Sequence, residues 1–405
     1  MAERALIVWW DGLRVGTLTQ DRHGDLAFTY AAAWREAVSA RALSRSLPLR
    51  AAPFDRRECR PFFGGLLPEE EQRRAAAGAL GVSGQNEFAL LDGLGGEVAG
   101  ALTLLPDGVT AELLAPMGST PLGEDALAAL LEGLPERPML AGASGLRLSL
   151  AGAQVKLPVV LVGGNPALPA PGQPTTHIIK PEIRRFPGSV ANEAWCMALA
   201  AAIGLDVAPA EPRMAGTIPY LLVTRYDRAA ADGAVVRVHQ EDACQALGIP
   251  SERKYAKEGG PGFRDLFALT RDYVRQPAVD VLKLIDVGIL NLAIGNADAH
   301  GKNFSFLLDA QGPRLAPFYD LLATIAWPTL DARLAMLVGR AGTVEELSAT
   351  AWQRFAADAG VTLPFLRRRI RSVTDAIGAA ISAGAPHFLS EQTARRADLV
   401  RQSLD

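Results

Sequence analysis

The fold of this chain is decided by one stretch, Gly295-Asn296-Ala297-Asp298-Ala299-His300-Gly301-Lys302-Asn303. Before it, apolar residues recur at spacings of three and four across residues 280–293, which predicts a core helix. After it, Phe304-Ser305-Phe306-Leu307-Leu308 is typical of a strand. The stretch is therefore predicted to be a short loop between two rigid elements, and it carries a carboxylate, an imidazole, an ammonium and an amide.

Asp298 and Asn303 stand five positions apart in this loop. An enzyme that transfers phosphoryl groups needs a carboxylate to orient the attacking hydroxyl and an oxygen ligand for magnesium close by. A kinase catalytic loop has this layout, with a base Asp followed by an Asn five positions later. Polar loops are common, so the spacing alone leaves a chance pairing open.

Two further segments favour the kinase interpretation. Residues 315–320 end an apolar run on Asp320, where a kinase keeps its second magnesium ligand. Residues 177–180 end a β-branched run on Lys180, as the phosphate-binding lysine of a kinase does. The chain order of Lys, Asp, Asn and Asp is also the kinase order.

Length and composition narrow the class of protein. A chain of 405 residues suggests two or three domains, and with 49% hydrophobic residues it can bury a sizeable core. The formal net charge of −3 argues against a general nucleic-acid coating but leaves room for a local basic patch. The three cysteines are far apart, so we expect reduced thiols in a cytoplasm. No apolar run approaches the roughly 18 residues that a membrane helix needs.

The first hundred residues predict a small antiparallel sheet. Strands are expected at 5–10, 14–18 and 26–30, with Asp11-Gly12 as a hairpin turn between the first two. A helix is expected to begin near Pro68. Nothing here has catalytic spacing, which favours a structural or partner-binding module. Residues 111–137 are interpreted as a linker with one helix, from about Glu124 to Gly133, that marks a domain boundary.

The next segment predicts a hairpin with a loop of small residues at its tip. Residues 145–150 alternate like a strand, and residues 157–162 are expected to be the return strand. A Walker loop would be followed by a helix, so that motif is excluded. Small residues can bring backbone N–H groups close to phosphates, as a kinase glycine-rich loop does. The loop consists of Ala151, Gly152, Ala153, Gln154, Val155 and Lys156.

For several side chains the sequence leaves two interpretations open. Glu193, in the first turn of a predicted helix, could pair with Lys180 or complement the helix dipole. His300 could ligate a metal with Asp298, as in a metal hydrolase, but no second histidine sits at ligand spacing. Four arginines at the start of a predicted helix could form a solvated face or contact a phosphate backbone; they are Arg367, Arg368, Arg369 and Arg371.

Taken together, these motifs resemble the HipA toxin kinases of bacterial toxin–antitoxin pairs, in family order over about residues 1–330. The resemblance implies an α+β, two-lobed protein-kinase-like fold with a small amino-terminal β-rich subdomain and an all-helical carboxyl-terminal lobe. It divides the chain into residues 1–110, an ATP-binding lobe at 140–235 and a catalytic lobe at 236–405. The matching pieces are Arg147–Lys156, Thr176–Lys180, Asn192-Glu193, Gln240–Asp242, Lys254-Tyr255, Gly259–Gly262, Asp298–Ser305 and Pro317–Asp320.

The resemblance also implies a role for each matching residue. The kinase would use ATP and Mg²⁺, with Asp298 as base and Asn303 and Asp320 as metal ligands. Ser149 matches the serine that such kinases autophosphorylate, with inhibition as the result. Val155 departs from the family's usual Glu or Pro. The remaining ATP-binding residues would be the Ala151–Lys156 loop, Lys180, Thr224, Arg225, Tyr226, His300 and Tyr319.

Partners follow from the same resemblance. A helix-turn-helix antitoxin would bind the kinase, and the complex would bind operator DNA. The protein substrate would be a translation component such as an aminoacyl-tRNA synthetase. Two alternatives stay open: a catalytically weak scaffold that acts as co-repressor with its antitoxin, and a small-molecule kinase related to aminoglycoside kinases.

Overall fold

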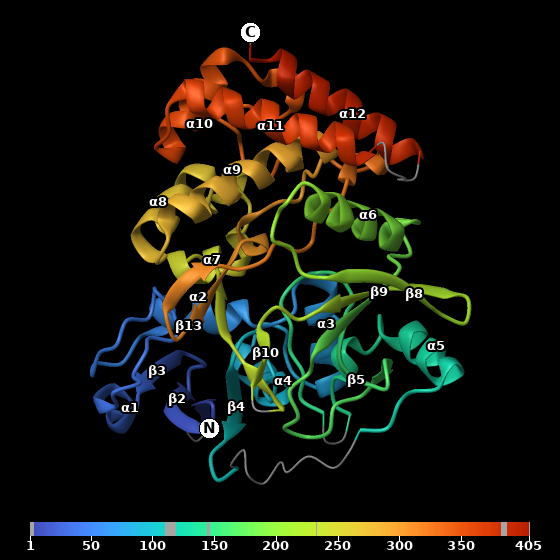
Figure 1. Ribbon diagram of the computed structural model, residues 1–405. Coiled ribbons are helices and arrows are strands. Elements are labelled where there is room, and N and C mark those ends of the chain that lie inside the picture. Colours follow the sequence, from blue (N-terminus) through green and yellow to red (C-terminus); the bar gives the residue numbers. More distant parts are fainter. Residues whose placement is uncertain (1–3, 110–118, 144–145, 232, 382–386, 405) are drawn as a thin grey trace. The chain divides into compact units, whose positions relative to one another are not determined.

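The computed structural model describes two compact units within one chain (Figure 1). The first unit comprises Met1–Pro181 and Arg213–Ser251, and the second comprises Glu182–Pro212 and Glu252–Asp405. The described residues are 4–109, 119–143, 146–231, 233–381 and 387–404.

The first unit opens with a four-stranded antiparallel sheet in the order β3-β2-β1-β4. The predicted hairpin is confirmed, because Asp11 and Gly12 both take positive φ values, 48° and 77°, as a two-residue turn requires. Residues 111–118 of the predicted linker lie outside the described residues. The strands are β1 (Arg4–Trp10), β2 (Leu13–Gln20), β3 (Leu26–Tyr30) and β4 (Leu102–Pro106).

Four helices cover this sheet and complete the amino-terminal subdomain, residues 4–106. They are α1 (Ala32–Glu36), α2 (Arg56–Gly65), α3 (Glu70–Leu80) and α4 (Glu87–Leu94). The helix expected near Pro68 is α3, but α2 was not predicted, because Pro61 lies inside it. A capping box between Asp55 and Glu58 and the burial of Phe62 and Phe63 stabilise α2 despite the proline.

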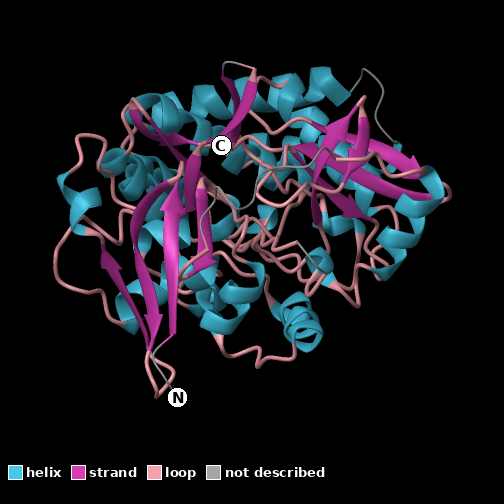
Figure 2. Ribbon diagram, turned by 90° about the horizontal axis from the view of Figure 1, so that it is seen from below, coloured by secondary structure: helices cyan, strands magenta, loops and turns pink. Residues whose placement is uncertain are grey.

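A second sheet of the first unit runs in the order β6-β5-β7-β9-β8, and Figure 2 shows the two sheets as separate groups of arrows. Its own core includes Leu127 and Leu131 of α5 (Glu124–Gly133), which is the helix predicted there. The strands are β5 (Leu157–Val162), β6 (Asn165–Ala167), β7 (His177–Pro181), β8 (Ala210–Ala215) and β9 (Ile218–Thr224). Further elements are β10 (Arg228–Ala231), β11 (Ala234–Arg237), β12 (His239–Asp242) and α7 (Ala243–Leu247).

The predicted hairpin between residues 145–150 and 157–162 is wrong in its first strand. Gly145 lies outside the described residues, and Leu148 forms only an isolated parallel bridge with Glu97. The reason is that both edges of β5 are already occupied, by β6 on one side and β7 on the other. Residues 147–149 therefore satisfy their backbone groups against the amino-terminal subdomain instead.

The second unit is mainly helical, with one β-hairpin. Its central helix, α9 (Pro277–Ile294), packs against α6, α8, α11 and α12, which explains why it is buried along most of its length. The predicted strand after the 295–303 loop is present as β13 (Ser305–Asp309), which pairs with β14 (Gly312–Leu315). The other helices are α6 (Ser189–Ala202), α8 (Phe263–Tyr273), α10 (Ala349–Ala359), α11 (Leu363–Ile381) and α12 (His387–Gln402).

Two other sequence predictions concern membrane-spanning helices and the cysteines. Among the residues that the structure describes, no helix is long and apolar enough to cross a membrane. Cys59, Cys196 and Cys244 are all buried, and none of the three forms a disulfide. The domain limits 1–110, 140–235 and 236–405 stay a prediction.

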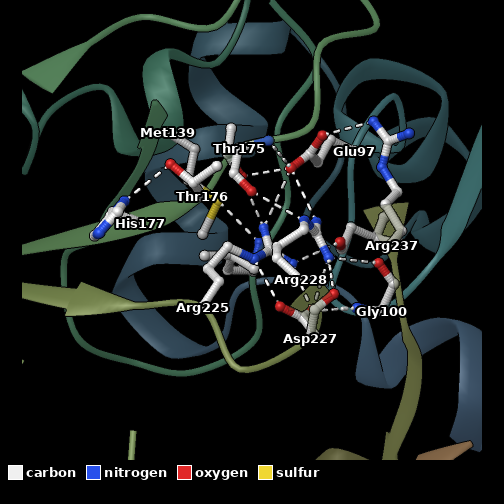
Figure 3. A network of polar contacts seen from close by, with 12 residues as sticks. Glu97, Gly100, Met139, Thr175, Thr176, His177, Arg225, Asp227, Arg228 and Arg237 are labelled. Carbon is white, nitrogen blue, oxygen red and sulfur yellow. Dashed lines mark hydrogen bonds and ion pairs between the residues drawn. The ribbon is translucent and has the colours of Figure 1, made fainter. Parts of the chain in front are cut away.

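A buried cluster of ion pairs joins the segments of the first unit (Figure 3). Asp227 accepts hydrogen bonds from the Gly100 N–H at 2.7 Å and from two nitrogens of Arg225 at 2.9 and 2.7 Å. Arg228 lies 3.2 Å from Asp227 and 3.0 Å from Glu97. These four charged side chains are at most 5% exposed, so each depends on its partners for compensation.

The ion pairs keep both carboxylates charged. Burial raises the pKa of the Asp227 carboxyl, but Arg225 and Arg228 outweigh burial and hold that pKa far below its usual range. The same balance lowers the pKa of the Glu97 carboxyl, where Arg228 and Arg225 are the main partners. Each carboxylate therefore stabilises the fold above its unfolded-state pKa, and this contribution is lost as the pH falls toward its folded-state pKa.

We predict that Asp227→Asn lowers the free energy of unfolding at pH 7 by about 3–5 kcal/mol, because it removes one of the two carboxylates that compensate the buried guanidinium groups. The difference from wild type should narrow as the pH is lowered below about 4, where the wild-type carboxylate begins to bind a proton in the unfolded state. Urea unfolding followed by circular dichroism at several pH values measures both effects.

Asp375→Asn is the matched control, because Asp375 pairs with Arg401 while 59% exposed. This variant should change stability by less than about 1 kcal/mol. Equal losses in the two variants would contradict the importance of the buried cluster.

Candidate active site

The 295–303 loop is held at its start by the end of α9. Gly295 takes φ 67°, and a Cβ there would lie 2.5 Å from Ile325, so the turn requires glycine. The Thr324 hydroxyl donates to the Gly295 carbonyl at 2.9 Å and accepts the Ala297 N–H at 2.8 Å. The Asn296 side-chain oxygen accepts the Asp298 N–H at 3.1 Å, which fixes the backbone of the predicted base.

The Asp298 carboxylate has a hydroxyl partner. The Tyr255 O–H donates to Asp298 Oδ1 at 2.7 Å, and the Tyr255 ring meets the His300 ring edge-on at 5.1 Å between centroids. The Lys254 carbonyl accepts the Gly301 N–H at 3.2 Å. The Lys254-Tyr255 pair thus lies against the loop. The sequence motif includes this pair, but no pattern in the sequence assigns a role to it.

Asn303 and Asp320 are brought together, as predicted for two metal ligands. Asn303 Nδ2 lies 3.5 Å from Asp320 Oδ2, and Asn303 Oδ1 accepts the His300 N–H at 3.2 Å. Asp320 takes φ 57°, a conformation that is uncommon for residues other than glycine and often marks a functional position. Tyr319 supports this corner by donating to the Lys302 carbonyl at 2.6 Å.

This donor set fits a hard cation. An amide and a carboxylate are oxygen ligands of the kind that Mg²⁺ accepts while keeping several waters. The described residues contain no group of three or more His, Cys, Asp or Glu that could hold a metal ion.

Lys180 lies in the other unit, on the central strand β7, where it pairs with Leu221 of β9. It is 5% exposed. An ammonium on a rigid strand is well placed to act as a fixed charge for a phosphate. Its predicted pairing with Glu193 stays a prediction.

The predicted phosphate loop, residues 151–156, closes on itself. Lys156 Nζ donates to the Ala151 carbonyl at 2.8 Å across the loop. Gly152 takes φ 110°, and a Cβ there would lie 2.7 Å from Lys156 Nζ. The Glu69 N–H donates to the Gly152 carbonyl at 3.1 Å, so the amino-terminal subdomain also holds this loop. Ala153, Gln154 and Val155 are half-buried.

Ser149 is fully buried two residues before this loop. Its hydroxyl donates to the Leu66 carbonyl at 2.7 Å, and its N–H donates to the Glu97 carbonyl at 2.8 Å. The next residue, Leu150, donates its N–H to Met139 Sδ at 3.1 Å. The segment that leads into the loop is therefore docked on its surroundings in this conformation.

The segment predicted to meet adenine, Thr224–Tyr226, is ordered at the end of β9. The Arg225 N–H donates to the Thr176 carbonyl at 3.0 Å, and the Arg225 guanidinium lies in the buried ion cluster. The Tyr226 hydroxyl donates to Gln240 Oε1. The Arg225 side chain therefore anchors the segment, and its contact with adenine stays a prediction.

The four arginines at the start of α11 differ in their exposure and in their partners. Arg369 pairs with Asp286 of α9, with Nε 2.5 Å from Oδ1, so it connects two helices. Arg368 and Arg371 are exposed, and Arg367 is half-buried. A contact with DNA stays a prediction for the exposed members.

Comparisons with known proteins identify relatives of this chain. The model of the HipA-like C-terminal domain matches residues 148–383, and that of the HipA N-terminal domain matches residues 6–105. A Sinorhizobium fredii protein named "Putative kinase Y4mE" is 56% identical over 421 residues, covering 100% of both chains. The serine/threonine-protein kinase toxin HipA of Shewanella oneidensis is 32% identical over 340 residues, 80% of this chain and 76% of that protein.

A solved structure agrees with these matches. The structure of Shewanella oneidensis HipA with HipB and its operator DNA superposes with a TM-score of 0.83 at 28% identity, covering 98% of this chain and 99% of that chain. This agreement confirms the predicted α+β fold with its helical carboxyl-terminal region. The chain belongs to the HipA family of serine/threonine kinase toxins.

Proposed function

We propose that this kinase transfers the γ-phosphoryl group of ATP to a serine or threonine hydroxyl of a protein, with Asp298 as the base. The observation that carries this proposal is the hydrogen bond from the Tyr255 hydroxyl to Asp298 Oδ1, 2.7 Å long. It supports the proposal because this oxygen accepts a hydrogen bond from a hydroxyl at the distance that general-base catalysis needs. A substrate hydroxyl would take the place of Tyr255 on this oxygen or use the second one.

The residues around Asp298 would divide the remaining work. Asn303 and Asp320 would hold magnesium, which supplies neutralisation of phosphate charge when it is bound. Asp298 would orient the hydroxyl and receive its proton. Tyr319 and His300 would lie beside the nucleotide.

The first unit would hold the nucleotide. Lys180 would bind phosphate oxygens through its ammonium, and the N–H groups of residues 151–156 would cover them. The backbone of Thr224 and Tyr226 would meet adenine. The folded loop and the paired strand support this assignment, because fixed donors lose little entropy when a ligand binds.

The wider function would be that of the toxin in a toxin–antitoxin pair in the cytoplasm. The relative of known structure is complexed with HipB and operator DNA. By analogy, this chain would bind a helix-turn-helix antitoxin and, through it, operator DNA. Its protein substrate would be a translation component such as an aminoacyl-tRNA synthetase.

Ser149 would be the site of an inhibitory autophosphorylation. Its hydroxyl is buried and donates to the Leu66 carbonyl, so residues 147–152 must leave their docked position before a kinase can reach it. A phosphate carries nearly two negative charges and only accepts hydrogen bonds at neutral pH. It could not return beside a carbonyl oxygen, and the phosphate loop would stay displaced.

We predict that incubation with ATP and magnesium adds one phosphate to the wild-type chain, at Ser149. Asp298→Asn should slow this reaction by about 10²–10⁴-fold, because the amide cannot take the hydroxyl proton. Intact-mass and peptide mass spectrometry measure both. A gain of phosphate by Asp298→Asn at the wild-type rate would contradict the role of Asp298.

We predict that Ser149→Asp weakens ATP binding by at least about tenfold, because a buried carboxylate would face the Leu66 carbonyl. Ser149→Ala is the matched control. It loses one hydrogen bond but introduces no charge, so its ATP affinity should stay within about threefold of wild type. Displacement of a fluorescent ATP analogue gives both affinities. Wild-type affinity in Ser149→Asp would rule out this switch.

A further inference from the structure

We propose that Glu97, a residue of the amino-terminal subdomain, positions both segments of the first unit that hold ATP. These segments are residues 147–152, which lead into the phosphate loop, and residues 224–226 at the end of β9. The inference rests on the nucleotide-binding roles proposed above. It gives the amino-terminal subdomain a part in nucleotide affinity.

The backbone of Glu97 holds the first segment. The Glu97 N–H donates to the Arg147 carbonyl and the Ser149 N–H donates to the Glu97 carbonyl, both at 2.8 Å. The two chains approach closely, because a Cβ on Gly96 would lie 2.7 Å from the Cβ of Arg147. Glu97 thus fixes the register of the residues that enter the phosphate loop.

The carboxylate of Glu97 holds the second segment. Its Oε1 accepts the Thr175 N–H at 2.8 Å and lies 3.3 Å from Arg225 Nη1. The following residue, Thr176, accepts the Arg225 N–H at 3.0 Å. Through Thr175 and Arg225, one carboxylate therefore sets the position of the backbone proposed to meet adenine.

The charge of Glu97 cannot be removed without consequence. Arg228 Nη2 and Arg237 Nη2 lie 3.0 and 2.9 Å from its two oxygens, and Figure 3 shows these contacts converging on Glu97. Without the carboxylate, Asp227 would face the neighbouring guanidinium groups alone. Burial lowers the pKa of the Arg228 guanidinium, and the positive charge of the nearby Arg225 lowers it further, because the two guanidinium groups repel each other. The guanidinium groups would separate and carry residues 225–228 with them.

The test substitutes Glu97→Gln, which keeps the shape of the side chain and removes its charge. The Kd for ATP, from displacement of a fluorescent ATP analogue, should rise by at least about tenfold, as expected when hydrogen bonds to a charged group are lost. In the phosphorylation assay the KM for ATP should rise similarly, while kcat stays within about threefold, because the base and metal ligands belong to the other unit.

Glu87→Gln is the matched control. Glu87 is a buried carboxylate of the same subdomain, 6% exposed, that pairs with Arg60 at 2.9 Å and Arg73 at 3.3 Å. These partners lie on α2 and α3, away from both nucleotide-binding segments along the chain. A purely structural role of Glu97 would give both variants the same ATP affinity, and this result would overturn the proposal.

Amide hydrogen exchange without nucleotide tests the positioning independently. The amides of Ser149 and Arg225 should exchange faster in Glu97→Gln than in Glu87→Gln. If the wild type binds no ATP, the proposed function fails, while exchange still decides whether Glu97 holds the two segments. Unchanged exchange at both amides would refute the inference.

Thr175→Val serves if Glu97→Gln does not fold. It removes the hydroxyl that donates to Glu97 Oε1 and accepts from Arg225 Nη1 at 2.9 Å, and it leaves the Thr175 N–H bond to Glu97 in place. We expect a smaller change in the same direction, about threefold in the Kd for ATP. An ATP affinity equal to that of wild type would contradict the proposal.

Discussion

The first unit depends on a small group of buried charges. Glu97 and Asp227 compensate Arg225, Arg228 and Arg237, and these residues come from two distant parts of the chain, residue 97 and residues 225–237. A buried ion cluster contributes little net stability compared with an apolar core, but it is strongly directional. Its effect here is to fix the end of β9 against Glu97 of the amino-terminal subdomain, whose backbone also holds residues 147 and 149. These are the segments that we propose to bind the nucleotide.

The loop at residues 295–303 could be predicted from the sequence because local rules decide it. The apolar spacing of α9, the glycine that ends it and the strand β13 confine residues 295–303 to a loop. A loop between two such elements has few conformations, so the spacing of Asp298 and Asn303 could be interpreted directly. The turn at Asp320, with its positive φ, brings Asp320 beside Asn303, as the kinase pattern predicts.

Other features follow from tertiary contacts that no local pattern reveals. The alternation in residues 145–150 suggested a strand, but β6 and β7 occupy both edges of β5. Glu97 showed no motif, since its partners lie up to 140 residues away. Arg225 was expected near adenine on the basis of the resemblance alone, whereas its side chain belongs to the ion cluster. Tyr255 could have been given a role only by knowing that its hydroxyl reaches Asp298.

The central claim is that Asp298, Asn303 and Asp320 act together on the nucleotide, as the proposed base and the proposed metal ligands. A crystal structure with a non-hydrolysable ATP analogue and magnesium tests this most directly. The account predicts Asn303 and Asp320 on the metal and Asp298 facing the γ-phosphate. A nucleotide bound away from these three residues would contradict it.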